Sequence, residues 1–202
     1  MICWSCERDA GAELTCASCG ALQPPDPAAT HFAVLGVPAV YAVDGTSLEA
    51  RYKDLSRKVH PDRFATSDPR ARRASLQRTV QLNEAWRTLR DPVRRAEYLL
   101  KLAGVTVGAD EVPPALLMET LELREELGEA RMAGDDAKVA RMGDAMRARA
   151  DAAMTAIAAG LAAGTAQGLQ AAAHELTALR YYRRFLDEVV AHEEKGESHA
   201  AG

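Results

Sequence analysis

The 202-residue chain has few aromatic side chains, no long apolar run and no cysteine beyond residue 19. Phe, Trp and Tyr make up 5% of the residues, and alanine-rich stretches dominate the second half, so we expect mostly helix. No apolar run approaches the roughly 20 residues that a membrane-spanning helix needs. The first residues also lack a basic segment followed by a hydrophobic one, so we expect no secretion signal. These absences favour a cytoplasmic protein without a membrane partner.

Several functional signatures are missing as well. The sequence has no phosphate-binding loop, no nucleophile elbow and no histidine beside its cysteines, which argues against an enzyme. The first 25 residues contain one Arg, no Lys and three acids: Glu7, Asp9 and Glu13. Phosphate binding needs clustered cations, so we expect no nucleic-acid partner for this segment.

All four cysteines lie at the start of the chain, as two C-x2-C pairs: Cys3, Cys6, Cys16 and Cys19. Two residues between cysteines let both sulfurs of one turn reach the same ion, and two such turns supply the four thiolates of a structural zinc site. Gly20 permits the tight backbone that such a turn needs. A segment this short cannot bury a core, so the metal would supply its folding free energy. Iron has the same ligand set and stays open, as does a disulfide or redox role.

A basic segment over residues 46–59 predicts a helix. Its apolar residues recur at intervals of four, three and four, which places them on one face: Leu48, Tyr52, Leu55 and Val59. Its cations fall off that face and are expected to form a positive surface: Arg51, Lys53, Arg57 and Lys58. Thr46 and Glu49 have the spacing of a capping box, which predicts the start of the helix.

The tripeptide His60-Pro61-Asp62 follows this helix directly. Pro61 ends the helix because proline cannot donate a backbone hydrogen bond and pushes the preceding residue out of the helical region. A second helix is expected from about Asp68 to Leu89. We therefore predict a helical hairpin with His60-Pro61-Asp62 at its exposed tip, where side chains serve contact rather than packing.

The chain divides into three expected parts. Residues 1–25 form the four-cysteine metal-binding module, residues 30–104 the hairpin domain, and residues 113–195 an antiparallel bundle of three helices, at about 114–132, 135–162 and 166–194. The segment Gln23-Pro24-Pro25-Asp26-Pro27 has the composition of a stiff linker. We expect this linker to insulate the hairpin domain from the metal module.

The first helix of the bundle carries apolar residues on two sides. At about 100° per residue, one side holds an ordinary core stripe: Leu116, Leu123, Leu127 and Ala130. A second stripe, more than about 100° away, holds Leu117, Met118 and Leu121, and is flanked by Glu122, Arg124 and Glu125. A surface helix needs one apolar stripe. The second is therefore either buried against the N-terminal domain or a docking patch with a charged rim.

The last helix adds one aromatic side chain to this question. Its core face is expected to comprise Leu169, Leu176, Leu179 and Val190. Tyr181 projects to nearly the opposite side, and an exposed tyrosine is a common interface anchor.

The chain from His31 to about Gly104 resembles a J-domain, the module that binds DnaK-type chaperones and stimulates their ATP hydrolysis. The resemblance rests on HFAVLGV, the basic helix, HPDRF, LNEAWRTLRDP and RRAEYLL. It implies that the basic helix approaches an acidic chaperone surface and that Asp62 contacts a cation of the partner. The implied chaperone-binding residues are Arg51, Lys53, Arg57, Lys58, His60, Pro61 and Asp62.

A J-domain followed by LLMETLELREEL and a helical bundle resembles the HscB family, the J-protein co-chaperones of iron–sulfur cluster assembly. The resemblance implies an all-α fold of a J-domain hairpin and a C-terminal three-helix antiparallel bundle. It also implies that an IscU-type scaffold protein binds Leu117, Met118, Leu121, Glu122, Arg124, Glu125 and Tyr181, the last standing where the family often has Phe. CW-x-C and ALQ-x-PD are similar to animal-type members, which carry the two-CxxC segment.

Three functions stay open at this point. The first is a co-chaperone that brings an IscU-type scaffold to a DnaK/HscA-type chaperone, whose own ATPase does the catalysis, so this chain has no catalytic residue. The second is a general J-domain co-chaperone with another client. The third is an enzyme or redox protein that uses the cysteines, or His60 with Asp62 as an acid–base pair. The sequence also leaves open which chaperone is used, how the metal module is oriented and whether the chain associates with itself.

Overall fold

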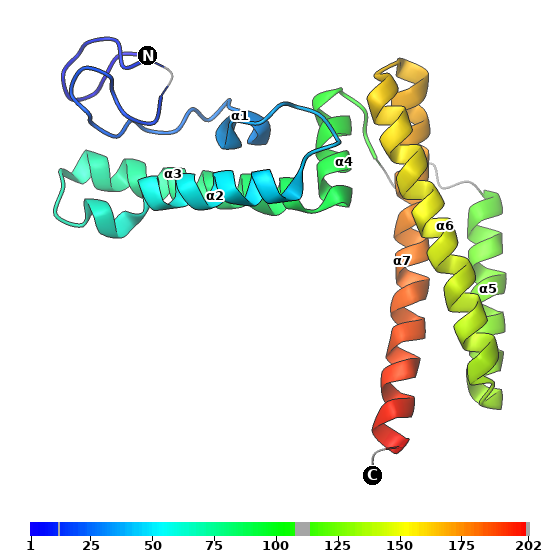
Figure 1. The fold of residues 1–202 in the computed structure, drawn as a ribbon. Helices are drawn as coiled ribbons and strands as arrows, with labels where there is room; N and C mark the ends of the chain where they lie inside the picture. Colours follow the sequence, from blue (N-terminus) through cyan, green and yellow to red (C-terminus); the bar gives the residue numbers. More distant parts are fainter. Residues whose placement is uncertain (12, 108–113, 201–202) are drawn as a thin grey trace. The chain divides into compact units, whose positions relative to one another are not determined.

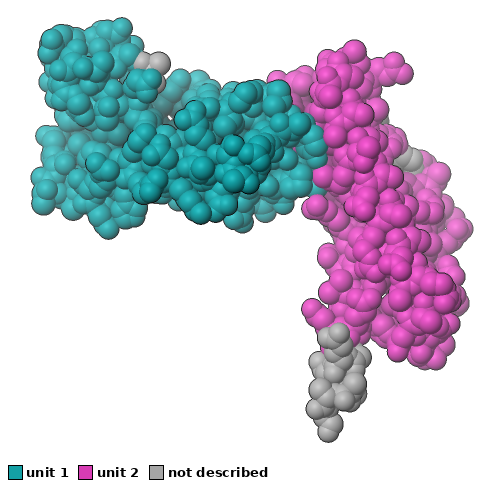
Figure 2. All heavy atoms as spheres, viewed as in Figure 1, with its two compact units in different colours: residues 1–95 teal, residues 96–202 magenta. Residues whose placement is uncertain are grey.

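The computed structural model of this chain describes residues 1–11, 13–107 and 114–200, with side chains to residue 194. The described residues form seven α-helices, one short 3-10 helix and no strand, which confirms the expected all-α fold (Figure 1). The chain divides into two compact units, residues 1–95 and residues 96–202 (Figure 2). Among the described helices, none combines the length and the apolar content needed to cross a bilayer.

The first unit contains the predicted helical hairpin. Helix α1 (His31–Leu35) contacts both arms of the hairpin, α2 (Gly45–Val59) and α3 (Pro69–Arg90), which lie side by side with η1 (Pro61–Phe64) at their tip (Figure 1). The core of the unit is made of buried apolar side chains, among them Phe32, Leu35, Leu48, Leu82 and Leu89. The tip of the hairpin is therefore held by a packed core along both arms.

Helix α2 begins earlier than the capping-box prediction placed it. Asp44 is the N-cap, and its carboxylate accepts a hydrogen bond from the backbone N–H of Ser47 at 2.9 Å. An aspartate satisfies an unpaired N–H and also complements the positive end of the helix dipole. Glu49 instead pairs with Lys53 one turn along the helix, at 2.6 Å.

The proline-rich linker lies against α3. Gln23, at its start, is 1% exposed. Arg78 donates to the carbonyl oxygens of Gln23, at 2.6 Å, and Pro24, at 3.1 Å, and Gln81 donates to that of Asp26, at 2.7 Å. The linker is therefore bound to the hairpin, because side chains of α3 donate to the backbone acceptors of this segment. These contacts argue against the expected insulation of the hairpin from the metal module.

Helix α4 (Pro92–Leu102) carries the chain from the first unit into the second. The second unit contains α5 (Pro114–Ala133), α6 (Asp136–Ala163) and α7 (Ala166–Ala200), which pack as the predicted bundle (Figure 1). Gly134 and Gly164 sit at the turns with φ of 68° and 62°, a left-handed backbone that favours glycine. Asp135 caps α6 through the N–H of Lys138.

The core of the bundle differs from the prediction on α7. Leu176 and Leu179 are buried as expected, but Val190 is 43% exposed and Val189 is fully buried in its place. Phe185 and Val189 pack with buried residues of α5 and α6 in one cluster. Toward its C-terminal end α7 shares its core with both neighbours, so the buried face there follows these contacts and not the stripe that begins at Leu169.

Candidate functional site

The four cysteine thiols converge on one point. Their sulfur atoms all lie within 4.8 Å of one another, and the pairs Cys3–Cys19 and Cys6–Cys16 are each separated by 3.7 Å. A tetrahedral ion with metal–sulfur bonds of about 2.3 Å places its ligands about 3.8 Å apart. The four side chains therefore fit a single tetrahedral metal ion.

Two equivalent turns deliver these thiols. Each turn is closed by an isolated β-bridge, and in each a backbone N–H donates to the first sulfur: Ser5 to Cys3 and Ser18 to Cys16, both at 3.4 Å. Gly20 has the left-handed backbone that the sequence predicted, with φ of 75°. Glu7 holds the equivalent place in the first turn and also has a left-handed backbone, with φ of 58°. Such a φ is uncommon for a residue other than glycine, so the sequence did not predict it.

The protonation of the thiols also favours a cation. Burial raises the pKa of the Cys3 thiol. The N–H groups of Ser5 and Cys6 and the neighbouring thiols lower it by more, so the pKa falls to about 6. The N–H of Ala21 lowers the pKa of Cys19, but desolvation and the other three cysteines raise it to about 11. Four sulfurs this close cannot all be anionic by themselves, because like charges repel, whereas a bound divalent ion stabilises all four thiolates.

Gln23 is a contact to this cluster that the sequence did not reveal. Its side-chain amide donates to the Cys3 sulfur at 3.3 Å and to the carbonyl of Ala21 at 2.8 Å. Trp4 adds a further tie, because its indole N–H donates to the carbonyl of Leu22 at 2.7 Å. Groups that donate to metal-bound thiolates orient them and tune the site. Twenty positions separate Gln23 from Cys3, so no local spacing could have predicted the pair.

The hairpin tip is fixed from α3. The hydroxyl groups of Ser75 and Thr79 donate to the carbonyl of Val59, the last residue of α2, at 2.6 Å and 3.4 Å. Helix C-termini leave carbonyls without partners, and a buried unpaired carbonyl is costly. Ser75 is completely buried and satisfies this one. The base of the loop is thereby tied to the second arm of the hairpin.

The tip itself presents charge to solvent. The Asp62 side chain is 90% exposed and that of His60 is 52% exposed. The N–H of Asp62 donates to Nδ1 of His60 at 3.3 Å, which shapes the loop from within. These exposures leave the Asp62 carboxylate available to a partner.

The cations of α2 are exposed, as predicted, but most are engaged within the helix or its neighbour. Lys58 pairs with Asp54 at 2.8 Å, which lowers the pKa of that carboxyl, and Lys53 pairs with Glu49. Arg51 donates to the carbonyl of Gly36 at 3.0 Å. The positive surface of α2 is therefore weaker than a count of its cations suggests.

On α5 the two predicted apolar stripes have different surroundings. In the core stripe Leu127 and Ala130 are buried, and Leu123 packs against the same cluster. Leu117, Met118 and Leu121 are 45%, 59% and 55% exposed. The second stripe is thus an exposed apolar surface, which we call the α5 patch.

The rim of the α5 patch is charged. Glu122, Arg124 and Glu125 are exposed, and Arg124 forms an ion pair with Glu188 of α7. Tyr181, predicted to be exposed, is half-buried. An exposed tyrosine anchor is therefore not what the structure shows.

A helical hairpin with His-Pro-Asp at its tip defines a J-domain protein, and residues 30–98 match the family described as DnaJ domain. Residues 112–190 match the family described as HSCB C-terminal oligomerisation domain. A co-chaperone protein HscB homolog of Burkholderia cenocepacia is 38% identical over 176 residues, which cover 84% of this chain and 97% of the relative.

Two solved structures agree. Chaperone HscB from Vibrio cholerae is 33% identical with a TM-score of 0.72, and the match covers 83% of this chain and 99% of that one. Human co-chaperone protein HscB is 26% identical with a TM-score of 0.83, over 96% of this chain and 98% of that one. The human match covers too much of the chain for the cysteine-bearing segment to lie wholly outside it. The chain belongs to the HscB family of co-chaperones, a non-enzyme kind of protein whose J-domain implies a chaperone of the Hsp70 type as partner.

Proposed function

We propose that this chain binds an IscU-type iron–sulfur scaffold protein, brings it to a DnaK/HscA-type chaperone and stimulates the ATPase of that chaperone. In this proposal residues 30–104 contact the chaperone, residues 113–195 bind the scaffold, and residues 1–25 form a metal-binding module. The chain itself supplies contacts and no catalytic group.

The α5 patch is the observation that carries the scaffold-binding part. Three large apolar side chains stand about half exposed on a helix whose opposite stripe already fills the core. Adjacent apolar residues with a charged rim are the usual anatomy of a protein interface. The same three positions correspond to the scaffold-binding stripe of the family that the sequence resembles. Glu122 and Glu125 would then contribute to the rim, whereas Arg124 would have to leave or share Glu188.

The chaperone-binding part rests on the hairpin tip. Asp62 is almost fully exposed, and the carbonyl that precedes the loop is fixed by Ser75. A loop held at its base and exposed at its tip presents its side chains in one arrangement, which reduces the entropy lost on binding. Arg51, Lys53, Arg57 and Lys58 would add attraction for an acidic surface at longer range.

The metal of the four-cysteine module is proposed to be zinc in a structural role. Four thiolates and no open ligand position are typical of structural zinc, which holds a short segment together. When bound, the ion supplies folding free energy, while the protein residues Ser5, Ser18 and Gln23 donate to the sulfurs. Elemental analysis of the purified protein separates zinc from iron.

The test is stimulation of a purified DnaK-type ATPase by the full chain, with and without an IscU-type scaffold. We expect the chain to stimulate hydrolysis alone and to stimulate it further when the scaffold is present. The triple variant Leu117→Ala/Met118→Ala/Leu121→Ala should keep the first effect and lose the second. Stimulation that ignores the scaffold in the parent protein would favour the general J-domain co-chaperone with another client.

A further inference from the structure

A series of contacts within the first unit joins the metal module to the loop that carries His60, Pro61 and Asp62, which we call the chaperone loop. It begins at Cys3, whose sulfur accepts from the Gln23 side chain at 3.3 Å. The backbone carbonyl of Gln23 then accepts from Nε of Arg78 at 2.6 Å. Gln23 is therefore bound to the metal site by its side chain and to α3 by its main chain.

Arg78 occupies a special place on α3. Burial lowers the pKa of its guanidinium, and among the described residues no carboxylate pairs with it. Its acceptors are the carbonyls of Gln23 and Pro24, so the position of the linker decides whether this partly buried cation has hydrogen-bond partners. The linker is therefore a bound part of the first unit and not a free spacer.

The same turn of α3 holds the base of the loop. Ser75, Arg78 and Thr79 are spaced by three and four residues, which places them on neighbouring positions of one helix face. Ser75 and Thr79 donate to the carbonyl of Val59, immediately before His60. The same turn of α3 thus contacts the linker through Arg78 and the end of α2, immediately before the loop, through Ser75 and Thr79.

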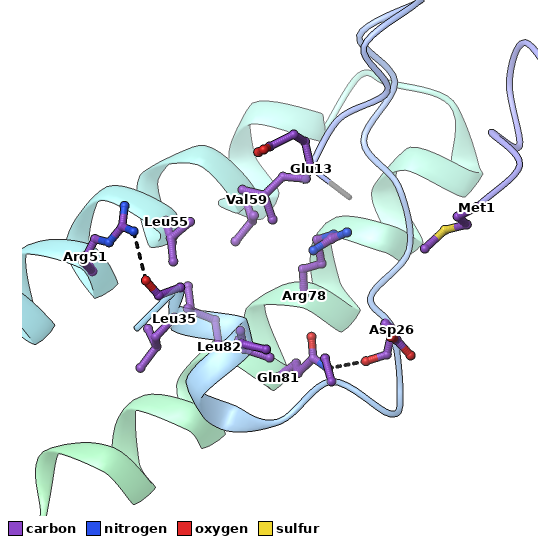
Figure 3. Close-up of a pocket in the computed structure, with 15 residues that line it drawn as sticks. Met1, Glu13, Asp26, Leu35, Arg51, Leu55, Val59, Arg78, Gln81 and Leu82 are labelled. Atoms are coloured by element: carbon purple, nitrogen blue, oxygen red, sulfur yellow. Dashed lines mark hydrogen bonds between the residues drawn. The ribbon is translucent and has the colours of Figure 1, made fainter. Parts of the chain in front are cut away.

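A cavity of about 700 Å³ lies between the module and the hairpin. Its lining includes Met1 and Glu13 from the module, Val59 from the end of α2, and Arg78 and Gln81 from α3 (Figure 3). The module therefore forms one wall of a space whose other wall is the base of the loop. If the module unfolds, this space opens further and the side chains that line it become more exposed to water.

We infer that metal occupancy of the four-cysteine module regulates the chaperone loop, with Gln23 sensing the metal-bound Cys3 thiolate and Arg78 transmitting the position of the linker to Ser75 and Thr79. With metal bound, the loop is held in its binding arrangement. When metal is lost, the linker leaves α3, Arg78 loses its acceptors and the loop loosens. The inference rests on the proposed function only for its consequence, the stimulation of a chaperone.

Hydrogen–deuterium exchange of the full metal-loaded chain tests the coupling without any partner. Chelation should raise exchange of the amides of His60 and of residues 62–65 by about tenfold, the effect of losing one charge-assisted hydrogen bond. Arg78→Ala should show the same rise while metal is still bound, and chelating that variant should add little. Arg87→Ala is the matched control, an exposed arginine on the same helix, and should behave like the parent protein.

Two further variants separate sensing from transmission. Gln23→Leu should hold metal about tenfold less tightly in competition with a chelator, because groups that orient metal ligands affect affinity on that scale. Its loop exchange should stay like that of the parent while metal is bound, since the carbonyl to Arg78 remains. Arg78→Lys keeps the charge with a simpler donor. It should give an intermediate exchange rate, and it replaces Arg78→Ala if that variant fails to fold.

Unchanged loop exchange after complete chelation of the parent would overturn the inference, as would equal and independent effects of chelation and Arg78→Ala. ATPase stimulation is measured in parallel and should fall several-fold on chelation. A metal-loaded parent that does not stimulate any DnaK-type ATPase refutes the proposed function alone, because the exchange experiment needs no chaperone.

Discussion

The chaperone loop and the α5 patch are built on opposite physical principles. The loop is a small set of polar and charged side chains whose base is fixed by directional hydrogen bonds, from Ser75 and Thr79 to Val59. The α5 patch is apolar and lies on a regular helix, where the helix alone fixes its shape. The first surface depends on geometry and salt, and the second depends on area removed from water.

The largest effect is expected from substitutions in the chaperone loop. His60→Gln or Asp62→Asn should reduce ATPase stimulation to the unstimulated rate, because both side chains are exposed and serve contact. Scaffold affinity and melting temperature should stay at the parent values. The assay is steady-state ATP hydrolysis with circular dichroism as the folding control. A fully active His60→Gln variant would contradict the role of the loop.

At the α5 patch the loss should be large but graded. Leu117→Ala, Met118→Ala and Leu121→Ala together should weaken scaffold binding by about 2–4 kcal/mol, since full burial contributes about 1.5–3 kcal/mol per side chain and each is already about half covered. Calorimetric titration measures the change, and the melting temperature should hardly move. The control is Leu127→Ala in the core stripe, which should cost about 2–5 kcal/mol of folding stability instead.

Ser75→Ala should have an intermediate effect that spreads from stability to function. It leaves the buried carbonyl of Val59 with the longer bond from Thr79, at a cost of about 1–3 kcal/mol in the free energy of unfolding. Stimulation should fall as the loop loosens, while scaffold binding is kept. Denaturant titration together with the ATPase assay checks both. Thr120→Ala is the contrast, because its hydroxyl bonds within its own helix and should matter little.

The smallest expected effect is that of salt. Raising ionic strength screens exposed charges beyond about 10 Å at 0.1 M, so chaperone binding should weaken by a few fold and scaffold binding should stay nearly constant. The effect is modest because Lys53 and Lys58 already pair with acids of their own helix. Binding titrations at several salt concentrations measure both slopes. Equal slopes for the two partners would show that the two surfaces do not differ as described.

Sequence reasoning reached the features that local periodicity controls. The two stripes of α5 follow from the angle between successive residues, and the exposure of Leu117, Met118 and Leu121 agrees with it. Gly20 was expected in a tight turn because this prediction depends only on the backbone freedom of the residue itself, and its φ agrees with it. The four thiols were expected to meet because each pair lies within one turn.

The features that it missed depend on residues far apart in the chain. Arg78 meets the linker across more than fifty positions, and Gln23 meets Cys3 across twenty. Val189 is buried in place of Val190 because α5 and α6 pack on that face of α7, and the pattern of α7 alone does not contain this information. Even the cap of α2 depended on a choice between Asp44 and Thr46 that the folded backbone settles.

Where α6 and α7 meet near their turn, Gly160 has no room for a side chain. A Cβ atom there would lie 2.4 Å from the carbonyl oxygen of Gly168 and 3.0 Å from Ala172. The absence of a side chain at Gly160 lets the two backbones approach at this point, and one added methyl group would push them apart. In homologous chains we therefore expect the residues at this contact between α6 and α7 to stay small, whereas residues around it can change between polar and apolar. Side-chain volume, more than polarity, should limit variation at this contact.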